Sequence, residues 1–238
     1  MRIISGQHKG KKLVGPPDAK TTRPIPDRVK TSLFNLLRGH YEGAHVVDLF
    51  AGTGAIGLET ASRGAARVLM VEKDKKIARV LETNIEHLGG PPACEVLVGD
   101  ALGPAVLTRC PRPINLLFAD PPYPLVRDPS GWRRVRAQFM KLIDEMTYEG
   151  FAALRTPWPF LHKADGGKGV DPASAHRPMV IDLDAASEGD LDALEDELAH
   201  MTGTAKFEPV DLTLENAEGP ETHVYGSTAV HLYMRKKA

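Results

Sequence analysis

The chain has few of the features that are typical of membrane proteins, secreted proteins or metal-binding proteins. Its 238 residues include two cysteines, Cys94 and Cys110, which are too few for a disulfide framework or a cysteine zinc site. No apolar run approaches the roughly 20 residues that cross a bilayer, and residues 1–10 lack the apolar centre of a signal peptide. We therefore expect a cytoplasmic protein with no membrane partner and no metal.

The net charge is also small, at −1, but this average conceals an uneven distribution. Residues 1–38 hold nine Lys/Arg and two Asp/Glu, a net +7, and residues 39–154 hold 13 and 14, a net −1. Residues 155–225 hold five and 15, a net −10, and residues 226–238 add three Lys/Arg. The basic first segment is typical of a surface that meets a polyanion. The alternative is a charged tail that contacts only solvent.

The length suits one large α/β domain with additions, or two small domains. We expect residues 1–38 to form a basic N-terminal arm and helix. Residues 39–238 then form the main domain, with an acidic insert at about 157–205 in which a strand near 179–183 and a helix from Ser187 are expected.

Apolar runs that alternate with helical patterns predict a parallel sheet covered by helices on both faces. Strands are expected at residues 44–50, 67–71, 96–98, 114–119 and 151–154. Helices are expected from Asp27, which can cap the first one, to Leu37, from a glycine turn to about Arg63, and over 75–88, 101–109 and 132–146. Residues 2–14 predict a β-hairpin with exposed lysines, and 207–214 and 227–234 predict an antiparallel closing hairpin.

A glycine-rich turn, Gly52-x-Gly54-x-x-Gly57, joins the first strand to its helix. The turn alone is weak evidence of function, because any strand-to-helix connection can use glycines for tight backbone geometry. Glu72 ends the next strand, where a carboxylate can accept hydrogen bonds from ribose hydroxyls. The pattern therefore indicates an adenosine cofactor, either a dinucleotide or another kind.

Two further acids favour S-adenosylmethionine over a dinucleotide. Asp48 precedes the glycines, where it can meet an amino-acid ammonium, and Asp100 ends the third strand, where it can meet the adenine amine. Neither acid would help to bind a pyrophosphate, although each could instead be a helix cap or a surface acid. The expected cofactor residues are Asp48, Phe50, Gly52, Thr53, Gly54, Glu72, Lys73, Asp100 and Ala101.

A second motif, Asp120-Pro121-Pro122-Tyr123, follows the fourth strand. The prolines fix φ and remove backbone donors, so the loop is stiff and its carbonyls can accept hydrogen bonds. Asp120 and the Pro121 carbonyl would hold a flat amine, and Tyr123 would stack on its ring. Asp and Pro are also common in ordinary turns. The first and fourth strands are expected to be neighbours, which would bring this motif and the glycine turn to one pocket.

At this point a family resemblance is visible. Asp-Leu-Phe-Ala-Gly-Thr-Gly at 48–54, followed by Asp-Pro-Pro-Tyr, resembles the class I methyltransferases that modify exocyclic amines. The chain also resembles the bacterial RsmD family. The resemblance is seen at residues 2–6, 9–13, 23–30 and 33–37, at Val71-Glu72-Lys73-Asp74 and at Tyr225-Gly226-Ser227-Thr228. The similarity covers residues 1 to about 155 and 222–235.

The resemblance implies a Rossmann-like fold with a mostly parallel seven-stranded sheet and an antiparallel C-terminal hairpin. It also implies methyl transfer from S-adenosylmethionine to the guanine N2 amine of one nucleotide in 16S ribosomal RNA, free or in the small subunit. The arm residues assigned to RNA phosphates are Lys9, Lys11, Lys12, Arg23 and Arg28. The acidic insert, and Pro26 in place of a small polar residue, depart from the family pattern.

Other functions are compatible with parts of the pattern. The same four residues, 120–123, would suit adenine N6 methylation of DNA or glutamine methylation of a protein, because both acceptors are planar amines. A non-catalytic RNA-binding or assembly protein could retain the cofactor pocket, although the complete motifs disfavour this. A dehydrogenase is disfavoured by Asp48 and by the lack of an evident hydride-transfer partner.

Overall fold

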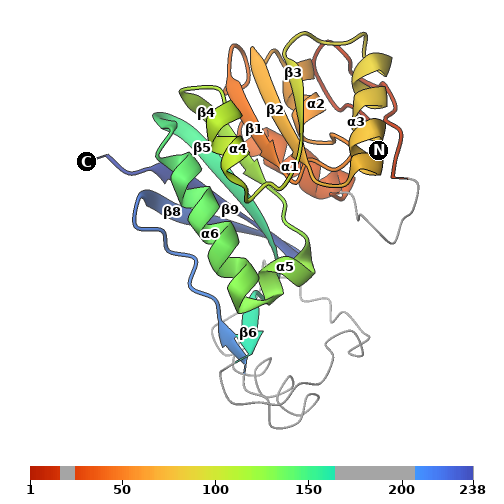
Figure 1. Ribbon diagram of the computed structural model, residues 1–238. Coiled ribbons are helices and arrows are strands. Elements are labelled where there is room, and N and C mark those ends of the chain that lie inside the picture. The colour runs from red at the N-terminus through yellow and green to blue at the C-terminus, as the bar shows by residue number, and fades with distance from the viewer. Residues whose placement is uncertain (17–24, 164–206, 238) are drawn as a thin grey trace.

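A twisted sheet runs through the middle of the molecule, with helices on both of its faces (Figure 1). The computed structural model describes residues 1–16, 25–163 and 207–237. The predictions for Arg23 and for most of the acidic insert lie outside these residues. No helix in the described ranges is long and apolar enough to cross a membrane.

The central sheet has seven strands in the order β3-β2-β1-β4-β5-β9-β8. The parallel strands are β1 (His45–Leu49), β2 (Arg67–Glu72), β3 (Cys94–Val98), β4 (Ile114–Ala119) and β5 (Met146–Pro157). The antiparallel strands are β9 (Thr228–Arg235) and β8 (Ala217–Tyr225). The predicted fold class, a mostly parallel Rossmann-like sheet with an antiparallel C-terminal hairpin, is confirmed.

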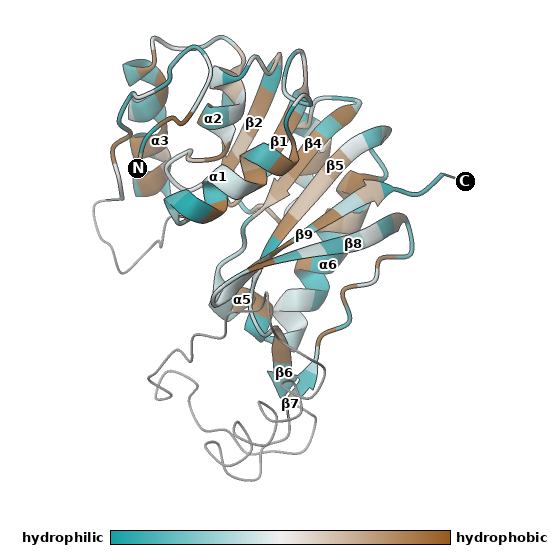
Figure 2. Cartoon of the chain, turned by 180° about the vertical axis from the view of Figure 1, so that it is seen from behind, coloured by the Kyte–Doolittle hydropathy of each residue, from teal (hydrophilic) through white to brown (hydrophobic). Residues whose placement is uncertain are grey.

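The helices divide between the two faces of the sheet. The arm and helices α1 (Asp27–Leu36), α2 (Gly57–Ser62) and α3 (Lys75–His87) pack on one face. Helices α4 (Pro104–Arg109), α5 (Tyr123–Arg127) and α6 (Pro129–Ile143) pack on the other. Successive strand residues point to opposite faces of the sheet. Val46 therefore packs in the core on the α1–α3 side, and Val47 packs in the core on the α4–α6 side. Figure 2 shows the resulting apolar colour along β1, β2, β4 and β5.

The N-terminal arm is a short hairpin whose apolar residues belong to the core. Arg2 and Lys12 form one antiparallel β-bridge, and the Ile3 N–H donates to the Lys11 carbonyl at 2.9 Å. Ile3 is 0% exposed and Leu13 is 7% exposed, both packed against the α1–α3 side. The expected hairpin is therefore present, and it is not a tail that contacts only solvent.

The closing hairpin differs from the prediction. Its strands are β8 and β9, whereas Phe207–Pro209 forms β7 and pairs with β6 (Leu161–Lys163) in a separate two-stranded sheet. The predicted strands, 207–214 and 227–234, leave Gly219 and Gly226 between them, but Gly219 lies inside β8 with a φ of 109° at a shift of register, so the strand continues through it. The turn is at Gly226, which has a φ of 61° and was predicted to lie between the strands.

Three predictions near the ends of helices were also wrong. Asp27 lies in the first turn of α1, and Pro26 occupies the N-cap position without a side-chain hydrogen bond. The expected helix over 132–146 ends at Ile143, and Met146 begins β5. Tyr123, expected in a loop, begins α5, because Pro122 and Pro124 favour the first turn of a helix.

Candidate active site

The glycine turn and the Asp120 loop begin at the ends of two neighbouring strands. Leu49 of β1 is paired with Ala119 of β4, and each strand then leads into one of the two motifs. To one side of β1 the sheet continues to β2 and β3, and to the other side to β4 and β5. Ligands of open parallel sheets bind at such a reversal of strand order, outside the carboxyl ends of the strands. The structure therefore brings the two motifs together, as the sequence predicted.

The glycine turn is packed at its back and open at its front. A side chain at Gly54 would place Cβ 2.4 Å from Leu81 Cδ1, and one at Gly57 would place it 2.5 Å from Met70. At Gly52, with a φ of 57°, a Cβ would meet no atom within 4 Å. Gly54 and Gly57 are thus required by packing, whereas Gly52 leaves space in which a ligand can approach the backbone.

Phe50 and Thr53 belong to the same turn. Phe50 has a φ of 60°, a strained conformation for a residue with a side chain, and such strain is common at binding sites. The Thr53 carbonyl accepts a hydrogen bond from Asn84 Nδ2 of α3 at 2.9 Å. Asn84, which is 0% exposed, also exchanges two hydrogen bonds with the Val14 backbone. One buried amide therefore joins the arm to the glycine turn, although nothing in the sequence pattern indicated it.

Glu72 lies where a ribose-binding carboxylate is expected. Its Oε2 accepts from the Gly52 N–H at 2.9 Å and its Oε1 accepts from the Asp74 N–H at 2.7 Å. Each carboxylate oxygen can accept a second hydrogen bond, so Glu72 can bind a hydroxyl without releasing the turn. Lys73 is exposed beside it. The open face at Gly52 and this acceptor set fit an adenosine cofactor.

Asp48 lies behind the turn and supports it. The side chain is 1% exposed, and its Oδ2 accepts from the Gly57 N–H at 2.9 Å, at the start of α2. Burial raises the pKa of Asp48 to about 8, the Gly57 hydrogen bond opposes this, and the negative charges of Asp120 and Glu72 add to it. The Asp48 carboxyl is thus buried in the protein interior. Its predicted contact with an ammonium stays a prediction.

Asp100 has the local role of a turn acceptor and also reaches solvent. Its Oδ1 accepts from the Leu102 N–H at 3.0 Å, and its Oδ2 lies 3.5 Å from an Arg134 guanidinium nitrogen of α6. The side chain remains 40% exposed, so a ligand can reach it. Ala101 is buried behind it, at 3% exposure. The adenine contact predicted for Asp100 stays a prediction.

The Asp120 carboxylate is bound by an arginine that sequence reasoning missed. Arg155 of β5 donates from Nε to Oδ1 at 2.7 Å and from Nη2 to Oδ2 at 2.9 Å. Arg155 Nη1 also donates to the Tyr123 hydroxyl at 3.0 Å. The Tyr123 hydroxyl donates to Thr228 Oγ1 at 2.8 Å. Arg155 was overlooked because the predicted fifth strand ended one residue before it.

This polar group borders a very small hollow. The hollow has a volume of about 10 Å³ and is lined by Asp120, Arg155 and apolar side chains that include Ile25, Leu33 and Val230. That volume suits about one water molecule. This hollow is far too small to hold a purine. Pro121 is buried and Pro122 is exposed at the edge of the loop.

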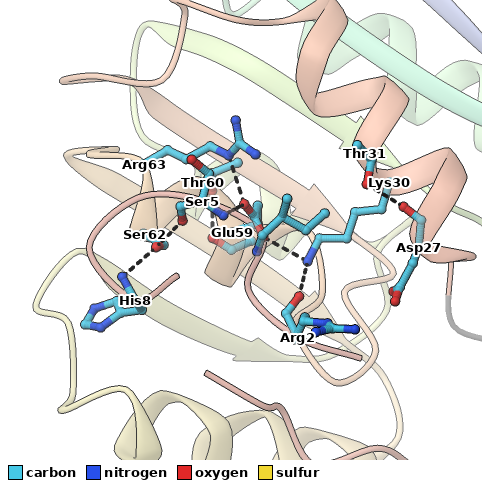
Figure 3. Close-up of polar contacts among 12 residues, drawn as sticks. Arg2, Ser5, His8, Asp27, Lys30, Thr31, Glu59, Thr60, Ser62 and Arg63 are labelled. Atoms are coloured by element: carbon cyan, nitrogen blue, oxygen red, sulfur yellow. Dashed lines mark hydrogen bonds and ion pairs between the residues drawn. The ribbon is translucent and has the colours of Figure 1, made fainter. Parts of the chain in front are cut away.

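The basic residues of the arm lie apart from Asp120. Lys9, Lys11 and Lys12 are exposed along the hairpin. Next to Lys9, the His8 N–H donates to Ser62 Oγ at 2.9 Å (Figure 3). Ser62 ends α2, whereas Gly57, the last glycine of the glycine turn, begins it. A six-residue helix is roughly 9 Å long, and this length separates the His8 contact at Ser62 from the Gly57 end of α2. Arg28 is exposed on α1.

Comparisons with known proteins agree with the resemblance seen in the sequence. The model of a family described as Conserved hypothetical protein 95 matches residues 1–138. Ribosomal RNA small subunit methyltransferase D of Escherichia coli (strain K12) is 39% identical over 123 residues, which cover 52% of this chain and 60% of that protein. The protein of the same name from Haemophilus influenzae is 34% identical over 128 residues, covering 52% and 64%. The chain thus spans less than two thirds of these relatives in the alignments.

Solved structures extend the similarity of fold to nearly the whole chain. A candidate methyltransferase of Escherichia coli, yhhF, has a TM-score of 0.64 at 24% identity and covers 99% of this chain and 98% of its own. A candidate methylase of Haemophilus influenzae has a TM-score of 0.61 at 21% identity, with the same coverage. These similarities show the fold. Because the family model matches more than half of the residues, the chain belongs to the family described as Conserved hypothetical protein 95, and its resemblance to the RsmD family is confirmed.

Proposed function

We propose that this protein transfers a methyl group from S-adenosylmethionine to the N2 amine of a guanine in 16S ribosomal RNA. The observation that carries the proposal is the pairing of Leu49 with Ala119, which sets the Asp120 loop beside the glycine turn. The names of the relatives support ribosomal RNA as the acceptor. The basic arm supports a polyanionic partner, and an RNA of this kind would place the protein in the cytoplasm.

Four residues would hold the cofactor, which supplies an electrophilic methyl group when it is bound. Gly52 gives close access to the backbone, and Glu72 offers free acceptor positions for ribose hydroxyls. The partly exposed Asp100 would accept from the adenine amine, and Phe50 would border the same edge of the sheet.

The protein's contribution to the reaction would be mainly orientation. The lone pair of an exocyclic amine is delocalised into the ring, so the amine is a poor nucleophile. Asp120 and the Pro121 carbonyl would accept its two hydrogens and turn the lone pair toward the methyl group, while Tyr123 stacks on the base. As the new N–C bond would form, the methyl group's bond to sulfur would break and leave a neutral thioether. The nitrogen would become acidic, and its proton would pass to the Asp120 carboxylate or to water.

A transfer assay with several acceptors tests the proposal. Wild-type protein and radiolabelled S-adenosylmethionine are incubated with naked 16S RNA, assembled small subunits, duplex DNA and bulk protein, and labelled nucleosides are then separated. We expect label in N2-methylguanosine from one of the two RNA samples. Label in N6-methyladenine from DNA would instead support the DNA alternative, and no transfer to any acceptor would contradict a methyltransferase function.

A further inference from the structure

Arg155 is placed where three elements of the candidate active site meet. Its guanidinium contacts Asp120 after β4, Tyr123 at the start of α5 and, at 3.4 Å, Thr228 Oγ1 at the start of β9. Its side chain is 13% exposed and that of Asp120 is 16% exposed. No motif that led to the proposed function includes this arginine.

We propose that Arg155 is a positioning residue for methyl transfer, which holds the Asp120 carboxylate and the Tyr123 ring in the arrangement that receives the acceptor amine. The inference rests on the proposed function and extends it to a residue outside the two motifs. It assigns Arg155 no contact with the reacting atoms.

The contact with Asp120 leaves acceptor capacity for a substrate. A guanidinium that binds both carboxylate oxygens fixes the plane of the carboxylate, since the two N–H donors are held in a rigid fork. Arg155 takes one acceptor position on each oxygen, and each oxygen can accept a second hydrogen bond. An amine can therefore bind to Asp120 while the ion pair remains intact.

The contact with Tyr123 fixes the aromatic ring through a directed chain of hydrogen bonds. Arg155 donates to the Tyr123 hydroxyl, which donates to Thr228 Oγ1, and Thr228 donates to the Thr156 carbonyl at 3.0 Å. Each hydroxyl has one proton, so this direction follows from the arginine being a donor only. The guanidinium carbon also lies 5.3 Å from the centre of the Tyr123 ring. Loss of Arg155 would release the ring as well as the carboxylate.

Arg155 is also the counter-ion of a negatively charged region. The negative charges of Asp120 and of Glu72 on β2 both raise the pKa of Asp48 on β1. Tyr123, at the start of α5, also contacts Arg155. Burial raises the pKa of Asp120, and the charge and hydrogen bonds of Arg155 offset only part of this rise. Removing the positive charge would raise that pKa further, so the acid would need a higher pH to be ionised.

Three variants test the inference. Arg155→Met removes the charge and the fork, Arg155→Lys keeps the charge without the fork, and Arg235→Met removes a hydrogen-bonded arginine from the far end of β9. In the RNA transfer assay we expect Arg155→Met to lower kcat about tenfold or more and to move the acidic limb of the pH profile up by about one pH unit. Arg155→Lys should lower kcat but leave the limb near its wild-type position. Arg235→Met should change neither.

A second measurement does not depend on activity. The side-chain carboxyl of Asp120 is titrated by carbon-13 NMR in the wild-type, Arg155→Met and Arg235→Met proteins, and S-adenosylmethionine affinity is measured by calorimetry. We expect a higher Asp120 pKa in Arg155→Met alone, with cofactor affinity unchanged within about threefold. An unchanged Asp120 pKa together with an unchanged pH profile would overturn the inference. If wild-type protein transfers no methyl group, the proposed function fails, and the titration still decides whether Arg155 controls Asp120.

Discussion

Lys30 and Glu59 form an ion pair with 3.0 Å between Nζ and Oε2, although neither side chain has any solvent exposure (Figure 3). Glu59 also accepts hydrogen bonds from the arm, at 2.7 Å from the Ile4 N–H and 2.9 Å from the Ser5 N–H. Lys30 donates to the Arg2 carbonyl at 3.1 Å. The arm is therefore attached to α1 and α2 through buried charges and does not depend on its apolar side chains alone.

Lys30→Met should destabilise the protein strongly. Removal of one partner leaves the other charge buried without its counter-ion, which costs about 3–5 kcal/mol of unfolding free energy. Arg63 remains 2.9 Å from Glu59, so we expect a value near the lower end. Urea unfolding at pH 7 measures the difference. Arg28→Met, on the exposed side of the same helix, is the matched control and should unfold like the wild type. Equal unfolding midpoints for both variants would contradict the role of the pair.

The three arm lysines should affect RNA binding through charge alone. Each phosphate contact contributes about 0.7–0.9 to the slope of log affinity against log salt concentration. We expect the triple variant K9A/K11A/K12A to lower this slope for 16S RNA by about 2 and to keep the wild-type fold, because all three side chains are exposed. The triple variant K141A/K236A/K237A changes the net charge equally at another surface. A larger loss of slope in this control would move the RNA-binding surface away from the arm.

Asp120→Asn should abolish methyl transfer without affecting cofactor binding. The amide keeps the size of the side chain but loses the charge, and one of its two polar atoms can no longer accept a hydrogen bond from an amine. We expect transfer to fall at least about 100-fold, with S-adenosylmethionine affinity unchanged within a few fold. Asp128→Asn is a suitable control, since Asp128 caps α6 and Asn is an equally good cap. Full turnover by Asp120→Asn would remove the assigned role.

Much of the fold could be predicted because its signals are local. Continuous apolar runs bounded by turn residues located the buried strands, and β4 has the predicted bounds, Ile114–Ala119. The antiparallel closing hairpin is present, but its first strand was predicted too early, at 207–214, because Gly219 was placed between the strands. A glycine with positive φ serves a strand bulge as well as a turn, and the choice depends on the partner strand β9.

The candidate site was predicted only as far as its motifs extend. Strand neighbours can be inferred from the alternating pattern. This was enough to predict that Gly52, Glu72 and Asp120 lie at one edge of the sheet. Arg155 and Asn84 were not predicted. Their partners lie 35 and 31 residues away in the sequence, and a single polar residue does not indicate which distant group it contacts.

Alanine substitutions at two glycines should separate packing from ligand access. Gly54→Ala places Cβ against Leu81 and Leu58 and should lower the stability by several kcal/mol, in the range of about 1–3 for overpacking plus about 1–2 for the left-handed backbone. Gly52→Ala meets no neighbour, so only the backbone cost applies. Its larger effect should be a weaker affinity for S-adenosylmethionine, measured by calorimetry. An unchanged affinity in folded Gly52→Ala would place the cofactor elsewhere.

His231 should make the protein less stable in mild acid. The ring is 0% exposed and is hydrogen-bonded at Nε2 to Thr156 Oγ1 and at Nδ1 to Thr222 Oγ1, both at 2.8 Å. Burial lowers the pKa of His231 from 6.5 to about 4 in the folded protein. The unfolded chain therefore binds this proton near pH 6.5, whereas the folded protein binds it only near pH 4.

The contribution of His231 to stability is consequently complete above about pH 6.5 and decreases as the pH falls toward 4. A shift of this size corresponds to a loss of roughly 3 kcal/mol over that interval. Urea unfolding at pH 7, 6, 5 and 4 measures it in the wild type and in His231→Gln, which cannot take up a proton. Because other groups titrate in both proteins, the difference between the two curves isolates the histidine. We expect the wild type to lose stability relative to His231→Gln as the pH falls below 6.5. Parallel curves would show that His231 is protonated equally in the folded and unfolded states.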